Sequence, residues 1–189
     1  WRAIVELPLN NDDERKSTVS ILSRLFGKRS GDRGNLRPLW HRTVEVAREK
    51  QWYAECGVAD SVPGRFDAIT MVLAAVLLRM EREETLIEPS VRLTELFVED
   101  MDGQLRNSGV GDLSVGKHVG KLMGVLGGRL GALREALLEG DAALTAFAER
   151  NTSMAEGGDP AKVAARLAAL VRELDTLTDG DLLAGNIRQ

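Results

Sequence analysis

The residues whose types and spacing could carry chemistry stand near the middle of the chain, at positions 109–117, which read Gly-Val-Gly-Asp-Leu-Ser-Val-Gly-Lys. From Gly111 to Lys117 the sequence has a glycine, four further residues and then Gly-Lys, which is the spacing of a phosphate-binding loop. Such a loop follows a β-strand and ends in serine or threonine, whereas a helix-forming acidic stretch precedes this one and His118 occupies the last position. The pattern therefore predicts a junction between two helices, with Asp112 capping the second.

Other residue types that often carry catalysis or bind metals are isolated in this sequence. Asp100 and Asp102 are two positions apart, which turns their side chains roughly 200° from each other on a helix, so they do not converge on one substrate. His41 and His118 each lack a second histidine at the spacing of helical metal ligands. Cys56 is the only cysteine, which excludes an intramolecular disulfide and a thiolate metal cluster. We expect no enzyme activity, no metal and no cofactor.

The composition indicates one soluble globular domain. The chain has 189 residues, of which 43% are hydrophobic and 29% are charged. Its formal net charge of -4 argues against a protein that binds nucleic acid mainly through electrostatics. The longest apolar run, residues 68–78, is too short to cross a bilayer and is closed by Arg79 and Glu81, so it predicts a buried helix.

The first 35 residues are expected to form a flexible N-terminal extension before a helical domain that spans residues 36–189. Residues 1–18 show no signal-peptide core and no clear period. The stretch that follows is apolar on one helical side and carries Arg24 and Lys28, a combination that favours contact with an anionic membrane surface. The side chains expected to face the membrane are Ile21, Leu22, Leu25 and Phe26. A disordered tail with a few apolar residues remains the alternative.

Apolar residues at helical spacing predict an all-α fold, a single-domain irregular bundle of about six to seven helices. We expect one helix from Pro38 to near Cys56, a mostly buried helix over residues 66–80 and an acidic helix that starts at Pro89. A glycine-rich helix follows from Val115. Two further helices are expected to start at a capping Asp141 and at residues 159–160, and the tail from position 178 is expected to pack back on the bundle.

The glycine-rich helix carries a leucine stripe and, beside it, glycines at every fourth position: Gly116, Gly120, Gly124 and Gly128. A glycine inside a helix costs about 1 kcal/mol relative to alanine, so such a run requires an offset. Close approach of a second helix backbone would provide it. We expect that second helix to belong to the same domain, and an apolar helix of a partner is the alternative.

Several short strings together resemble the ubiquinol-cytochrome c chaperone family, whose members are helical assembly factors for cytochrome b of respiratory complex III. The resemblance extends from about position 21 to position 185, and residues 109–117 are its most specific part. The chain departs from the family pattern at two places. An aromatic pair is usual where it has Leu126-Gly127, and a proline is usual where it has Ala59. The other strings are Trp52-Tyr53, Gly57-Val58, Asp60-Ser61, Gly64-Arg65-Phe66-Asp67, Asp100-Met101-Asp102, Leu105-Arg106 and Gly128-Arg129.

This resemblance implies a non-enzymatic chaperone that holds newly made, hydrophobic cytochrome b in an assembly-competent state. It implies a cytoplasmic location at the inner face of the cytoplasmic membrane of a bacterium. The anionic membrane surface and a small co-chaperone, which mitochondrial relatives use, remain open as further partners, and no nucleic-acid partner is expected.

The client is expected in a groove between the acidic helix and the glycine helix. The residues expected to contact it are Arg65, Asp100, Asp102, Arg106, Asp112, Gly116, Lys117 and Gly120. In the structural alternative, Asp112 only caps a helix and Asp102 pairs with Arg106. The alternative functions are a helical adaptor on the membrane surface and a nucleotide-binding protein that uses Gly111 and Lys117.

Overall fold

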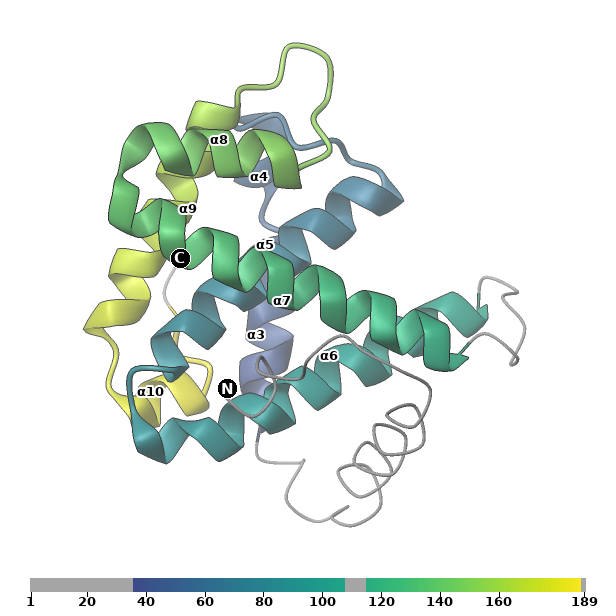
Figure 1. The fold of residues 1–189 in the computed structure, drawn as a ribbon, viewed down its shortest axis with the longest axis vertical. Helices are drawn as coiled ribbons and strands as arrows, with labels where there is room; N and C mark the ends of the chain where they lie inside the picture. The colour runs from purple at the N-terminus through teal and green to yellow at the C-terminus, as the bar shows by residue number, and fades with distance from the viewer. Residues whose placement is uncertain (1–35, 108–114, 188–189) are drawn as a thin grey trace, which may run out of the picture.

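The long helix α5 (Val62–Met80) runs through the centre of the computed structural model, which describes residues 36–107 and 115–187 (Figure 1). Within those ranges six α-helices have eleven residues or more, and the only β-pairing is an isolated bridge between Val58 and Met154. The expected all-α, single-domain bundle is confirmed. The other elements are α3 (Arg37–Ala47), α4 (Lys50–Ala54), the 3-10 helix η2 (Glu84–Leu86), α6 (Ile87–Asn107), α7 (Val115–Glu139), α8 (Asp141–Asn151), α9 (Pro160–Thr176) and α10 (Asp179–Leu183).

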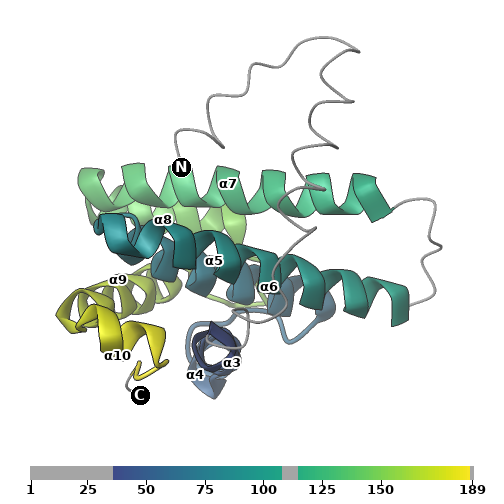
Figure 2. The same cartoon turned by 90° about the horizontal axis from the view of Figure 1, so that it is seen from below.

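α5 is the most buried helix, as its apolar sequence predicts, and every residue from position 67 to position 80 is buried. It starts four residues earlier than expected, because the Ser61 hydroxyl caps it by accepting a hydrogen bond from the Gly64 N–H at 3.3 Å. α7 lies on one side of α5, and α3 lies on the opposite side (Figure 2). α9 also packs against α5, so this helix is covered around most of its circumference.

The single helix expected from Pro38 to near Cys56 is wrong, because the structure divides it into α3 and α4. Two aromatic side chains account for the division. The Trp52 indole donates to the Val46 carbonyl at 2.8 Å, and the Tyr53 hydroxyl donates to the Ala47 carbonyl at 2.9 Å. The Val46 and Ala47 carbonyls at the end of α3 therefore accept from side chains of α4, and the Val46 carbonyl also accepts from the Glu49 N–H at 3.2 Å.

Two loops that are distant in sequence pair through their backbones beside α5. The Ala59 N–H donates to the Ser153 carbonyl at 2.8 Å, and the Ala155 N–H donates to the Gly57 carbonyl at 2.8 Å. Gly57 has φ 81°, and a Cβ placed on it would lie 2.4 Å from the Gly158 Cα. Only a pair of glycines allows the two backbones to approach this closely.

Two helix starts differ from the sequence expectation. α6 begins at Ile87, and Pro89 falls within its first turn instead of opening it. α8 has Gly140 as its N-cap, with φ 100°, and Asp141 occupies the first turn without capping. The aspartate still carries its negative charge at the positive end of the helix dipole.

The tail from position 178 packs back on the bundle, as expected. Leu182 and Ile187 are buried, and α10 contacts α3. The buried Arg79 of α5 holds the segment by donating to the Leu177 carbonyl at 3.0 Å and to Asp179 Oδ1 at 2.8 Å. Arg42 of α3 donates to the Ile187 carbonyl at 2.9 Å.

Among the described helices, none has the length and apolar character needed to cross a membrane. The proposed membrane-facing residues Ile21, Leu22, Leu25 and Phe26 lie outside the described residues, as does the whole of the expected extension over residues 1–35.

Replacement of Gly64 by alanine is expected to destabilise the protein by about 1–3 kcal/mol, the usual cost of overpacking. The added Cβ would lie 2.0 Å from the Ala59 carbonyl oxygen. Urea denaturation of the purified variant measures the loss. Gly103→Ala in α6 is the matched control, because nothing described lies within 4 Å of its added Cβ, and it should stabilise by up to about 1 kcal/mol. Equal effects of the two substitutions would contradict the close contact at Gly64.

Candidate functional site

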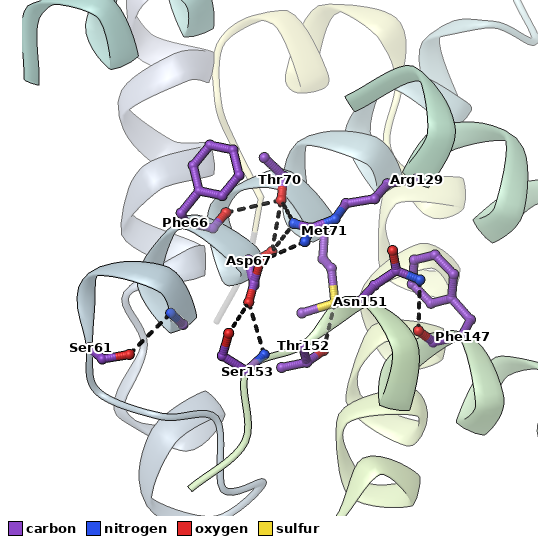
Figure 3. Close-up of polar contacts among 11 residues, drawn as sticks. Ser61, Phe66, Asp67, Thr70, Met71, Arg129, Phe147, Asn151, Thr152 and Ser153 are labelled. Carbon is purple, nitrogen blue, oxygen red and sulfur yellow. Dashed lines mark hydrogen bonds and ion pairs between the residues drawn. The ribbon is translucent and has the colours of Figure 1, made fainter. Parts of the chain in front are cut away.

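A buried ion pair joins two of the strings singled out in the sequence. Arg129 Nη2, on α7, lies 2.5 Å from Asp67 Oδ1, on α5, and each side chain is 11% exposed (Figure 3). The other carboxylate oxygen of Asp67 accepts from the backbone N–H and the hydroxyl of Ser153, at 2.8 and 2.7 Å. Asp67 thus ties α7 and the loop after α8 to the central helix.

The same arginine connects α7 to an aromatic row. Its Nη1 donates to the Thr70 hydroxyl, and its guanidinium lies 5.8 Å from the centroid of Phe66. Phe66 in turn lies 6.5 Å from Phe97 of α6, which meets Trp40 of α3 edge to face at 6.1 Å. One continuous set of contacts therefore runs from α7 through α5 and α6 to α3.

The loop that carries Ser153 is itself fixed by polar contacts. The Asn151 side chain donates to the Phe147 carbonyl at 2.9 Å, and the buried Thr152 hydroxyl lies 3.4 Å from the Met71 sulfur (Figure 3). These contacts hold Ser153 where it can donate twice to Asp67. Most donors and acceptors of this network are bonded to other groups of the protein, so the network has a structural role.

At the surface of the same corner lies Arg65, one of the predicted client contacts. Its Nε is 2.7 Å from Asp60 Oδ1, and both side chains are more than half exposed. The hydrogen bond from Arg65 lowers the pKa of Asp60. Burial, followed by the negative charge of Asp60, raises the pKa of the neighbouring Tyr53. Arg65 is accessible to a partner.

The acidic helix and the glycine helix are neighbours in the structure. α6 and α7 extend together beyond the end of α5, next to each other (Figure 2). Asp100 and Asp102 lie on α6 and are half-buried, and Gly120 is exposed on α7. Arg106 lies in α6, and Gly116 and Lys117 lie in α7. The side chains of Arg106 and Lys117 and the whole of Asp112 lie outside the described part of the chain. The predicted groove and its rim therefore stay a prediction.

The glycines of α7 form an exposed surface, and the expectation that they pack against a helix of the same domain is wrong for the described residues. A Cβ added at Gly120, Gly124, Gly127, Gly128 or Gly131 meets nothing described within 4 Å. The opposite, leucine side of α7 does the packing, and Leu126 and Leu130 are almost fully buried. We call this surface the glycine face; it consists of Gly120, Gly124, Gly127, Gly128 and Gly131.

The Asp67–Arg129 pair was not predicted from the sequence. Both residues stood in the quoted strings, but nothing in their spacing indicated that they meet across 62 positions. The available signal was a carboxylate at the start of an apolar run, since a buried acid requires a partner. In the described residues no group of three His, Cys, Asp or Glu side chains could hold a metal ion, and His41 is exposed.

Comparisons with known proteins agree with the resemblance drawn from the strings. The family model described as ubiquinol-cytochrome C chaperone matches residues 54–188. The crystal structure of the Cbp3 homolog from Brucella abortus superposes with a TM-score of 0.71 at 28% sequence identity, and the match covers 88% of this chain and 94% of that one. A search of curated proteins gave no match.

Replacement of Asp67 by alanine is expected to cost about 3–5 kcal/mol, because it leaves the buried Arg129 without its partner. The double variant Asp67→Leu/Arg129→Leu should cost less than Asp67→Ala alone, since no buried charge remains. Urea denaturation of both variants gives the two free energies of unfolding. Asp60→Ala, which removes the exposed partner of Arg65, is the control and should leave the midpoint unchanged. A mild effect of Asp67→Ala, similar to that of the control, would show that the pair does not hold α7.

Proposed function

Because the chain belongs to the ubiquinol-cytochrome c chaperone family, we propose that it binds newly made cytochrome b and supports the assembly of ubiquinol-cytochrome c reductase, complex III. The observation that carries the proposal is the family match over residues 54–188. The likeness to the Cbp3 homolog from Brucella abortus supports it over most of both chains. The role is that of a non-enzymatic chaperone, with no cofactor.

The glycine face of α7 is the proposed contact for the client. Cytochrome b is a hydrophobic membrane protein, and its newly made apolar helices need a surface that shields them. Glycines allow a second helix to approach the backbone of α7 closely, with good van der Waals packing. Each glycine of this face lowers helix stability by about 1 kcal/mol relative to alanine, and no described neighbour offsets that cost. A partner helix that packs against the face supplies the missing offset.

The charged residues predicted for the rim of the groove are the remaining proposed client contacts. A polar rim around an apolar centre is the usual arrangement of a protein interface. The exposed Arg65 and the half-buried Asp100 and Asp102 fit such a rim. The other proposed contacts are Arg106, Asp112, Gly116, Lys117 and Gly120.

The proposed site of action is the inner face of the cytoplasmic membrane, where the N-terminal segment with Ile21, Leu22, Leu25 and Phe26 would contact anionic lipid. A membrane-surface adaptor without a client is the second candidate, favoured by that segment alone. Flotation with anionic vesicles, with and without residues 19–29, tests the membrane contact. A small co-chaperone stays an open partner.

Nucleotide binding at Gly111 and Lys117 is the remaining alternative. α6, a helix, precedes this stretch where a phosphate-binding loop requires a strand. Calorimetry with magnesium and ATP should give no signal, and binding that Lys117→Ala abolishes would overturn the chaperone assignment.

Deletion of the gene from its source organism is expected to deplete assembled complex III, while the cytochrome b transcript stays at its normal level. Native gel electrophoresis and a spectrum of reduced membranes measure the amount of assembled complex III. Quantitative reverse transcription measures the cytochrome b transcript. A normal amount of complex III in the deletion strain would refute the proposed function.

A photoreactive amino acid placed at Gly124 of the glycine face is expected to crosslink cytochrome b in cells that are assembling complex III. The exposed Ala165 of α9 is the matched control position, because it is also a small helical residue at the surface, and it should give no crosslink. Equal crosslinking from both positions, or none from Gly124, would place the client elsewhere.

A further inference from the structure

α7 changes character between Gly128 and Arg129. Residues 115–128 contain five glycines, three valines and a histidine, all of which form helices poorly. Residues 129–139 contain one glycine and otherwise alanine, leucine, arginine and glutamate, which form helices well. We call these the glycine half and the anchored half of α7.

The contacts of the two halves differ in the same way. The anchored half is fixed by Arg129 to Asp67 and by Arg134 to Glu81 Oε2 at 2.7 Å, and its Leu133 is fully buried. Between positions 119 and 128 the sequence has a single polar side chain, Lys121, which is exposed. This part of the glycine half is therefore held to the bundle by apolar packing alone.

That apolar packing is narrow. Leu122 and Leu126 are buried, and Val119 and Met123 are partly buried against the core. The remaining positions from 119 to 128, apart from Lys121 and Val125, are glycines of the exposed face. A segment with few buried side chains and low helix propensity opens locally, at a lower free energy than the rest of the fold.

We propose that the glycine half of α7 opens as a unit while the anchored half stays bound, with the break immediately before Arg129. The Asp67–Arg129 network fixes the end of the moving segment, and the Gly127-Gly128 pair absorbs the change in backbone direction. Opening uncovers Val119, Leu122, Met123 and Leu126, which have the i, i+3, i+4, i+7 spacing with which a helix engages an apolar partner.

The partner class is an apolar transmembrane segment, and this part of the inference rests on the proposed function. In the closed form the leucines of the glycine half are covered, so this half presents its glycine face and not its leucine side. In the open form the leucine side is available as well. The glycines thus have two roles, since they leave one face bare and they keep the cost of opening low.

Hydrogen–deuterium exchange of the full chain, measured by mass spectrometry without client, tests the opening. Amides at 119–126 should exchange at least about tenfold faster than those at 132–139. The variant Gly120→Ala/Gly124→Ala/Gly127→Ala should slow the first group by about fivefold for each alanine, because the added methyl groups favour the helix and meet nothing described.

Gly131→Ala is the matched control, since it is an equally open glycine in the anchored half, and it should leave exchange at 119–126 unchanged. Equal protection of both halves would overturn the proposal, as would a triple variant that slows both halves alike. In a Cys56→Ala background, Leu126→Cys should react with a thiol reagent faster than Leu133→Cys, and equal rates would also overturn it.

These outcomes are separate from those of the deletion strain. Uniform exchange along α7 together with depleted complex III would reject the opening and keep the proposed function. Unequal exchange together with normal complex III would keep the opening and reject the transmembrane client.

Discussion

The ion pair between Asp67 and Arg129 is the constraint on which much of the remaining arrangement depends. A buried carboxylate is stable only with its charge balanced and its lone pairs occupied, and here an arginine from α7 and two donors from Ser153 meet that demand. Since Asp67 belongs to the most buried helix, the positions of α7 and of the loop after α8 follow from it. The aromatic row through Phe66 extends the same constraint to α6 and α3.

Helical periodicity predicted the long helices because each has one side that must be buried. α7 and α9 needed no information beyond their own sequences, and α5 was correctly predicted to be the most buried element. The break between α3 and α4 could not be predicted in this way. Its cause is the reach of Trp52 and Tyr53 back to the carbonyls of Val46 and Ala47, a geometry that period and composition do not describe.

The glycines of α7 illustrate the limit for the candidate site. Their spacing and their unfavourable helix propensity indicated correctly that a packing partner or another compensating contact is needed. Helical periodicity shows which residues share a face, but it does not show which face the rest of the fold covers. In the structure the leucine side of α7 packs against the bundle, and the glycine side is exposed. The predicted rim of charged residues met a different limit, since Asp112 and the side chains of Arg106 and Lys117 fall outside the described residues.

The segment from position 178, which packs on α3, has a consequence for the integrity of the core. Leu39 of the first described helix is fully buried, and α10, Ile187 and the close contact of Gly185 with the Pro38 carbonyl all contribute from the other end of the chain. A copy without residues 178–187 would leave the α3 side of the core exposed to water. These residues are thus needed to complete the core, and their loss would expose the kind of apolar surface that makes a chain prone to aggregation.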